Sequence, residues 1–247
     1  MKRLQFTGLL FCTALLFFLA SCGGNKSKEQ TNTDSTAVEN NTNAVVPAPN
    51  TIITTPVTMM SVTHKVADYE KFQASYDAHD SLRLANGLHS YVIARGVDDP
   101  NTVMVVVKVD DIEKARAFSK DAGLKNAMKE AGVTGAPTIT FSTSTWQDTA
   151  TLPPGTIRSR TTFTVKDWDA WVKSFMEGKQ ERLNNGITDR VVGHDADDNK
   201  KVSLVTAVLD TAKAFAYYKS DALKKRREAG GVIGEPKRFL FTVVKRY

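Results

Sequence analysis

Cysteine is almost absent from this chain. Its 247 residues include only two, Cys12 and Cys22, and both lie near the amino terminus. The chain after Cys22 therefore has no disulfide, no free thiol and no cysteine-ligated metal site. A domain built from it must be held together by its hydrophobic core, and the length is sufficient for two domains of ordinary size.

Motifs that identify several common enzyme classes are also missing. No Gly-x-Gly-x-x-Gly follows a predicted strand, and there is no phosphate-binding loop and no Gly-x-Ser-x-Gly turn. The four histidines show neither His-x-x-x-His nor His-Glu-x-x-His spacing; they are His64, His79, His89 and His194. We therefore expect no bound metal, no other cofactor, and neither nucleotide-dependent nor serine-hydrolase chemistry.

The first 21 residues are typical of a signal peptide. Lys2 and Arg3 precede an apolar run over 9–20 that is shorter than a membrane-spanning helix. The run ends in Leu-Ala-Ser-Cys, which resembles a bacterial lipobox. The resemblance implies cleavage before Cys22, attachment of lipid to its sulfur and anchoring to a membrane. A plain secretory signal and a short membrane anchor are the alternatives.

Residues 22–56 are predicted to form the lipidated cysteine and a disordered tether. The segment after Cys22 is rich in Asn, Thr, Ser and Pro and contains no aromatic residue, so it cannot bury enough apolar surface to offset the entropy of ordering. Gly23, with no acidic run behind it, resembles lipoproteins of the outer membrane that face the periplasm. We therefore expect a location in a bacterial cell envelope, where nucleic acid is not an expected partner.

The rest of the chain repeats itself at an offset of 99 residues. The segment VADYEKF at 66–72 returns as VKDWDAW at 165–171. Further identities at this offset are Arg83 with Arg182, Asn86 with Asn185, Gly87 with Gly186, Leu124 with Leu223, Gly135 with Gly234 and Pro137 with Pro236. So many matches indicate duplication of a whole domain, because this period exceeds that of solenoid repeats. The predicted domains are 57–146 and 156–247, joined by a linker over 147–155.

Each copy is predicted to have the order strand, helix, strand, strand, helix, strand. The first helix starts after an aspartate that can cap it, Asp68 or Asp167, and ends at Asn-Gly. Its aromatic residues recur at spacings of three and four, as expected for a stripe that packs on a sheet. Order and length are those of a ferredoxin-like domain, in which two helices cover one face of a four-stranded antiparallel sheet. The fold class is therefore α+β, with two tandem ferredoxin-like βαββαβ domains.

The first copy resembles a known superfamily over almost its full length. The motifs are HKVADYEKFQASYDAH, NGL, RGVDDPNTVMVVVKVDDIEKARAF and LKNAMKEAGVTGAP, and the second copy follows them loosely in the same order. They resemble the dimeric α/β-barrel superfamily, which includes antibiotic-biosynthesis-monooxygenase-like and stress-response barrel proteins. The resemblance implies that the two sheets pack face to face as a monomeric, intramolecular pseudo-dimeric barrel. Packing on another chain is the alternative.

The resemblance leaves the chemistry open. The superfamily includes cofactor-free oxygenases, haem-degrading enzymes, decarboxylases, isomerases and members without known activity. The sequence shows no convergent acid, base and nucleophile, so we expect a non-catalytic barrel that binds a small hydrophobic or acidic molecule or a partner. A cofactor-independent oxygenase acting on a small hydrophobic or aromatic substrate is the alternative, followed by a purely structural module.

Two histidines of the first copy are candidate site residues. His79 continues the aromatic stripe of the first helix, where an imidazole could act as a general base or a haem ligand, and Gly178 takes its place in the second copy. His64 ends the first strand, where the second copy has Phe163. Packing of His64, and a hydrogen bond from His79 to a neighbouring group, are the ordinary alternatives to catalysis by His79 or ligand binding by either residue.

Strand alternation predicts a second candidate site, on the sheet face away from the helices. That face should carry Met59, Ser61 and Thr63 in the first copy and Arg158, Arg160 and Thr162 in the second. A slip of one residue would invert the assignment. Buried there, Arg158 and Arg160 would need a partner, which could be a carboxylate of the protein or an acidic ligand. Salt-bridged or solvent-facing arginines are the alternative.

Charge is divided unevenly between the two copies. Residues 57–146 contain 10 Lys and Arg against 11 Asp and Glu, whereas residues 156–247 contain 19 against 12. A basic patch could contact anionic lipid or the acidic first copy. A solvated helix face is the ordinary interpretation.

Overall fold

The computed structural model describes residues 50–247. The predicted signal peptide, the predicted lipidation site at Cys22 and most of the predicted tether lie outside the described residues. Across the part of the chain that is described, no helix is long and apolar enough to span a membrane.

Both repeats have the predicted order of elements. The second helical stretch of each is broken near its middle, as predicted, and the first helix is also divided into two. The first repeat consists of β2 (Val57–Val66), α1 (Tyr69–Ala78), α2 (Asp80–Ala85), β3 (Leu88–Gly96), β4 (Thr102–Val109), α3 (Ile112–Lys120), α4 (Ala122–Glu130) and β5 (Val133–Asp148). The second consists of β6 (Ile157–Val165), α5 (Trp168–Glu177), α6 (Lys179–Asn184), β7 (Ile187–Asp195), β8 (Lys201–Val208), α7 (Thr211–Tyr218), α8 (Asp221–Ala229) and β9 (Val232–Arg246). The first helix divides at His79 in one repeat and at Gly178 in the other.

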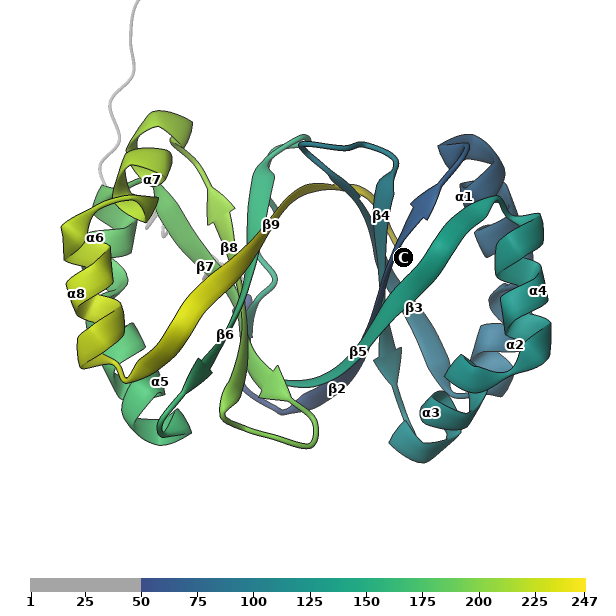
Figure 1. Cartoon of the computed structure of the whole chain (residues 1–247), viewed down its shortest axis with the longest axis horizontal. Coiled ribbons are helices and arrows are strands. Elements are labelled where there is room, and N and C mark those ends of the chain that lie inside the picture. Colours follow the sequence, from purple (N-terminus) through teal and green to yellow (C-terminus); the bar gives the residue numbers. More distant parts are fainter. Residues whose placement is uncertain (1–49) are drawn as a thin grey trace, which may run out of the picture. The chain divides into compact units, whose positions relative to one another are not determined.

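Eight strands form a closed barrel (Figure 1). Their order is β5-β2-β4-β3-β9-β6-β8-β7, and β7 pairs with β5 to close the ring. Two antiparallel pairings, β3 with β9 and β5 with β7, join the repeats. Helices cover the outside of each repeat's own four strands. The fold is therefore α+β, with two ferredoxin-like domains forming a pseudo-dimeric barrel within one chain, as the sequence predicts.

The start and the end of each first helix follow from local sequence. The side chains of Asp68 and Asp167 accept hydrogen bonds from the backbone N–H three residues later, at 2.9 and 2.8 Å, as N-caps do. Gly87 and Gly186 follow α2 and α6 with φ of 67° and 68°. Only glycine enters this left-handed region at little cost, so the chain turns there into β3 and β7.

The aromatic stripe of each first helix forms core. Phe72, Trp171 and Phe175 are 4%, 4% and 8% exposed, and they pack with strand residues of their own repeat. Burial of each such side chain contributes about 1.5–3 kcal/mol. These aromatic side chains lie between helix and sheet, so they hold each repeat together and leave the barrel interior to other residues.

Ordered chain begins before the predicted domain boundary at residue 57. Ile52–Ile53 form the short strand β1, which pairs with Asp148 and Gln147 at the end of β5. The strand β1 thus lies within the segment predicted as tether, and β5 extends to Asp148, into the segment predicted as linker. Both residues of β1 are exposed, so no hydrophobic periodicity marks a strand so short.

Candidate functional site

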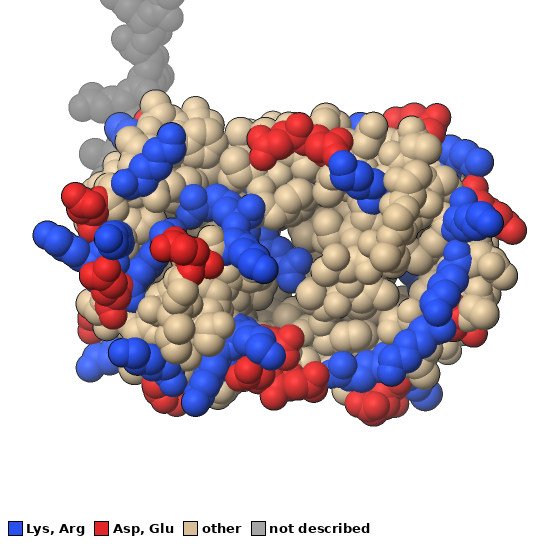
Figure 2. Space-filling view, in the orientation of Figure 1, with Lys and Arg blue, Asp and Glu red and all other residues tan. Residues whose placement is uncertain are grey.

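The inner faces of the strands enclose a cavity of about 110 Å³ that both repeats line. Figure 2 shows the molecule hollowed at its centre, with lysine and arginine side chains gathered on the side that the second repeat forms. Met59 and Ser61 of β2 and Arg158 and Arg160 of β6 lie on this wall. The face that strand alternation assigns to these four residues is therefore the face that lines the cavity.

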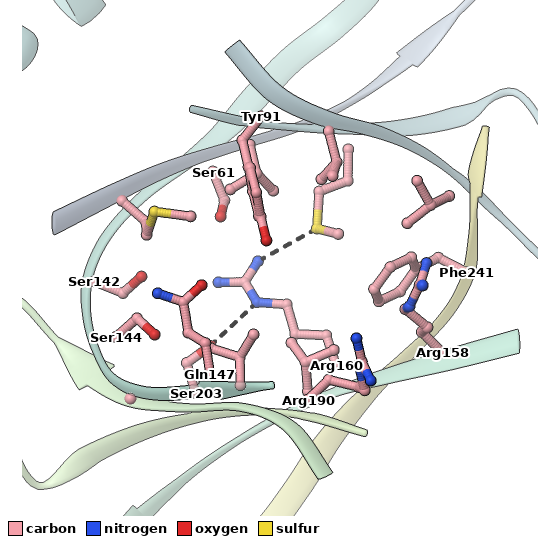
Figure 3. A pocket seen from close by; sticks show the side chains of 18 of the residues that line it. Ser61, Tyr91, Ser142, Ser144, Gln147, Arg158, Arg160, Arg190, Ser203 and Phe241 are labelled. Atoms are coloured by element: carbon pink, nitrogen blue, oxygen red, sulfur yellow. Dashed lines mark hydrogen bonds between the residues drawn. The ribbon is translucent and has the colours of Figure 1, made fainter. Parts of the chain in front are cut away.

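Arg160 reaches into the cavity without meeting a carboxylate (Figure 3). It donates hydrogen bonds to the Thr140 hydroxyl at 3.0 Å and, weakly, to the Ser203 hydroxyl at 3.4 Å, and it contacts the Met104 sulfur at 3.9 Å. Burial lowers the pKa of Arg160, because the charged guanidinium is separated from water. All of its protein partners are neutral.

Arg158 has still fewer partners. Its side chain is buried, with the residue 8% exposed, and it makes no hydrogen bond or ion pair with any residue of the described range 50–247. Burial lowers its pKa to about 10, and the nearby positive charges of Arg246 and Arg190 add to the effect. Arg158 is therefore a buried charge surrounded by charges of the same sign.

The cavity wall includes one carboxylate, Asp148. Asp148 pairs with Arg190 at 3.1 Å, and Arg190 also donates to the carbonyl of Ala150. Burial lowers the pKa of Arg190, and the charge of Asp148 partly offsets this. With Arg246, the wall therefore carries four guanidinium groups and one carboxylate.

All four arginines belong to the second repeat, and each has an equivalent position in the first. At the offset of 99 residues, Arg158 corresponds to Met59, Arg160 to Ser61, Arg190 to Tyr91 and Arg246 to Gln147. Strand pairing confirms the equivalence: Met59 is opposite Ser142 and Lys108, and Arg158 is opposite Phe241 and Ala207, again at this offset. The barrel therefore has a cationic half and a neutral half.

Sequence reasoning missed Arg190, Arg246 and Asp148. Arg190 lies at an irregularity in β7 between Asp189 and Val191, and such a bulge breaks the alternation on which a face assignment depends. Arg246 lines the cavity because β9 pairs with β3 of the other repeat. The offset of 99, applied to every strand of the barrel, is the signal that could have found both arginines.

A second cavity, of about 380 Å³, adjoins the first and shares Ser142, Arg160 and Ser203 with it. Its wall adds charges of both signs, from Asp195, Lys201, Glu235 and Lys237. Arg160 thus lies at the boundary between the arginine-lined cavity and this larger, mixed one.

The structure places His64 elsewhere, between the helices and the sheet of the first repeat. His64 is 5% exposed, its ring centroid lies 4.9 Å from that of Phe72, and neither ring nitrogen has a partner among the described residues. Burial lowers its pKa to about 4. It lines an apolar cavity of about 100 Å³, so His64 is a neutral imidazole with two unused hydrogen-bonding atoms.

His79 lines the same cavity but is exposed. Its Nδ1 lies 2.7 Å from the carbonyl oxygen of Ser75, one turn earlier in α1. The predicted site residues therefore separate into two groups: His64 and His79 lie on the helix side of the sheet, and Arg158 and Arg160 lie on the barrel side. In residues 50–247, no three His, Cys, Asp or Glu side chains are grouped as metal ligands.

Comparison with known proteins identifies the fold. Neither a protein-family model nor a curated protein matches the chain. Similar solved structures include an anthrone oxidase-like protein, with a TM-score of 0.54 and 15% identity over 79% of this chain and 95% of that one. A provisionally assigned monooxygenase from Fusobacterium nucleatum has a TM-score of 0.50 and 14% identity over 76% and 93%.

A provisionally assigned chlorite dismutase also matches, with a TM-score of 0.50 and 15% identity over 76% of this chain and 95% of that one. Identities this low establish the fold alone. This chain has the ferredoxin-like, dimeric α+β barrel fold of these proteins, with both halves of the barrel in one polypeptide.

Proposed function

We propose that the barrel is a binding protein for a small acidic molecule, held in the arginine-lined cavity between the two repeats. The observation that carries the proposal is that, within residues 50–247, Arg158 has no hydrogen-bond or ion-pair partner and Arg160 has only neutral partners. Arg190, by contrast, has Asp148. Two guanidinium groups face an enclosed cavity that has room for a ligand.

The energetics favour an acidic ligand over a neutral one. An ion removed from water costs several kcal/mol unless a charge or strong hydrogen bonds compensate it. Arg158 incurs that cost in the free protein, and its neighbours Arg190 and Arg246 increase it. A bound carboxylate would accept bidentate hydrogen bonds from a guanidinium and would relieve both effects. Binding energy would then come from charges that the fold already holds in place.

Calorimetry on the purified protein tests the proposal. Small carboxylic acids should bind at low ionic strength, and binding should weaken by at least about tenfold in Arg158→Met and in Arg160→Ser. These variants carry the residues that the first repeat has at the equivalent positions. Arg116→Met is the matched control, because Arg116 is on the surface and pairs with Asp197 at 2.7 Å. Equal affinity in all four proteins, or no binding of any acid, would overturn the proposal.

A cofactor-independent oxygenase is the second candidate. Its support is the apolar cavity of the first repeat, where the two unpartnered nitrogens of His64 could bind a substrate hydroxyl. Solved structures with this fold include an anthrone oxidase-like protein. Measurement of oxygen uptake with anthrones and hydroquinones tests this candidate. The variant His64→Phe is the control, because the second repeat has phenylalanine at the equivalent position. Uptake that is absent, or unchanged by His64→Phe, would count against this candidate.

We also propose that the binding barrel is lipid-anchored in a bacterial cell envelope through Cys22. Its support is the apolar run that ends in Leu-Ala-Ser-Cys and the polar segment that follows. Growth with labelled palmitate should label the protein, and Cys22→Ser should abolish the label. Persistent labelling of that variant would contradict the anchor without affecting the proposal for the cavity.

A further inference from the structure

We infer that the ligand is a small dicarboxylic acid whose two carboxylates are separated by a short spacer, one bound by Arg160 and the other by Arg158. This inference rests on the proposed function and specifies the chemistry of its ligand. It depends on two features of the wall: two guanidinium groups that lack an anionic partner, and their side chains lying in different parts of the cavity (Figure 3).

The first feature is the balance of charge on the wall. Asp148 compensates Arg190 at 3.1 Å, and Arg246 is exposed at the end of β9, where solvent screens it. Arg158 and Arg160 remain, and both are withdrawn from solvent. Two unmatched positive charges favour a ligand with two negative charges over one with a single charge.

The second feature is the separation of Arg158 and Arg160. They point to the same face of β6 two positions apart, so their Cα atoms are about 6.5–7 Å apart. Figure 3 shows Arg158 beside Phe241, whereas the guanidinium of Arg160 lies between the Ser203 hydroxyl and the Met104 sulfur. Arg190 and Arg246 lower the pKa of Arg158, whereas the hydrogen-bond partners of Arg160 are the neutral hydroxyls of Ser203 and Thr140. The two guanidinium groups are therefore separate binding positions.

The rest of the wall suits the spacer and the free carboxylate oxygens. Apolar side chains line the cavity along its length; they are Met59, Met104, Val106, Val205, Phe241 and Val243. The hydroxyls of Ser61 and Ser142 also line the cavity, and they can donate to a carboxylate oxygen.

Calorimetry with four probes tests the inference: succinate, adipate, butyrate and inorganic phosphate, each at low ionic strength with the purified full chain. Binding at the second arginine is intramolecular once the first carboxylate is bound, so a dicarboxylate should bind at least about tenfold more tightly than butyrate. Phosphate carries comparable charge on one centre, so it should bind less tightly than the better of the two dicarboxylates. Comparing succinate with adipate locates the preferred spacer.

Variants of the two arginines complete the test. Arg160→Ser and Arg158→Met should each reduce dicarboxylate affinity to the level of butyrate, and Arg160→Gln serves as a second, larger replacement if Arg160→Ser does not fold. If butyrate bound as tightly as the dicarboxylates, or if phosphate bound more tightly than both dicarboxylates, the inference would be overturned. The proposed function would remain intact. Failure of all four probes to bind would overturn the proposed function as well.

Discussion

The two repeats of this chain share one backbone fold but contribute different side chains to the interior of the barrel. At the four equivalent wall positions the first repeat has Met, Ser, Tyr and Gln, and the second has arginine at all four. A symmetric dimer would place eight arginines around the same cavity, at a large cost in repulsion. Fusion of two copies removes that constraint, so one half can carry the charge while the other supplies neutral surface.

The arginine that anchors the first helix shows the same divergence. Arg182 pairs with Asp189 through two hydrogen bonds of 2.7 Å, and both side chains are buried. Its counterpart Arg83 donates to the Ser90 hydroxyl at 3.1 Å and to Asp80 at 3.0 Å. The compensating carboxylate therefore lies on the sheet in the second repeat and on the helix in the first.

Loss of the buried pair in the second repeat should have the largest effect. Asp189→Ser copies the first repeat, where Ser90 is equivalent, but Lys179 stands where the first repeat has Asp80. Arg182 would then be buried without an anion, at a cost of about 3–5 kcal/mol in the free energy of unfolding. Urea unfolding measures this loss. Adding Lys179→Asp should restore part of it, and a loss below about 1 kcal/mol would show that the anchors are interchangeable.

Acid should expose the difference between His64 and Phe163. The pKa of His64 is about 4 in the folded protein against 6.5 in a model compound, so between these values the unfolded chain binds the additional proton. The free energy of unfolding should therefore fall as pH drops from 6.5 towards 4, by about 3 kcal/mol in total. Unfolding curves of wild type and His64→Phe across this range check the slope. Identical slopes would contradict a buried neutral histidine.

The glycines that follow α2 and α6 should differ in their tolerance of a side chain. A Cβ at Gly186 would lie 2.5 Å from Cβ of Asp210, whereas at Gly87 it would lie 3.3 Å from Cβ of Asp110. Both have positive φ, which alone costs about 1 kcal/mol for alanine. We expect a loss of about 1 kcal/mol for Gly87→Ala and at least about 2 kcal/mol for Gly186→Ala, measured by urea unfolding. The reverse order would contradict the closer approach of Asp210 to position 186.

Arg158→Met should give the smallest effect, and of the opposite sign. It replaces a buried charge that has no counter-ion in residues 50–247 with the side chain at the equivalent position of the first repeat. We expect the ligand-free protein to gain about 1 kcal/mol in the free energy of unfolding, while acid binding weakens. Thermal and urea unfolding measure the gain. Destabilisation of the ligand-free protein would indicate that Arg158 has a structural role.

Much of the fold could be predicted because its signals are local and occur twice. Asp68 and Asp167 cap helices, Gly87 and Gly186 end them, and the aromatic stripe between these points is buried. The division of the first helix at His79 was not predicted, because Gly178 occupies the equivalent position and the two residues share no obvious breaking tendency. β1 was missed because two exposed residues show no periodicity.

The candidate site could be predicted only in part. Alternation along β6 placed Arg158 and Arg160 on one face, because side chains of a regular strand point to opposite sides in turn. β7 has an irregularity between Asp189 and Val191 that breaks this alternation, and the sequence made no face assignment for Arg190. Alternation could not reach Asp148, which the sequence pattern assigned to a linker and the structure assigns to β5.

The sequence alone determined the duplication, the α+β class and the order of elements, since these depend on hydrophobic periodicity, caps and turns within each copy. The tertiary structure decided which side chains meet. Closure of the barrel by β3 with β9 and β5 with β7 brings four arginines, one carboxylate and a neutral wall around a single cavity. That arrangement depends on contacts between residues far apart in the chain, and charge in an enclosed space acts through distance and burial rather than through sequence order.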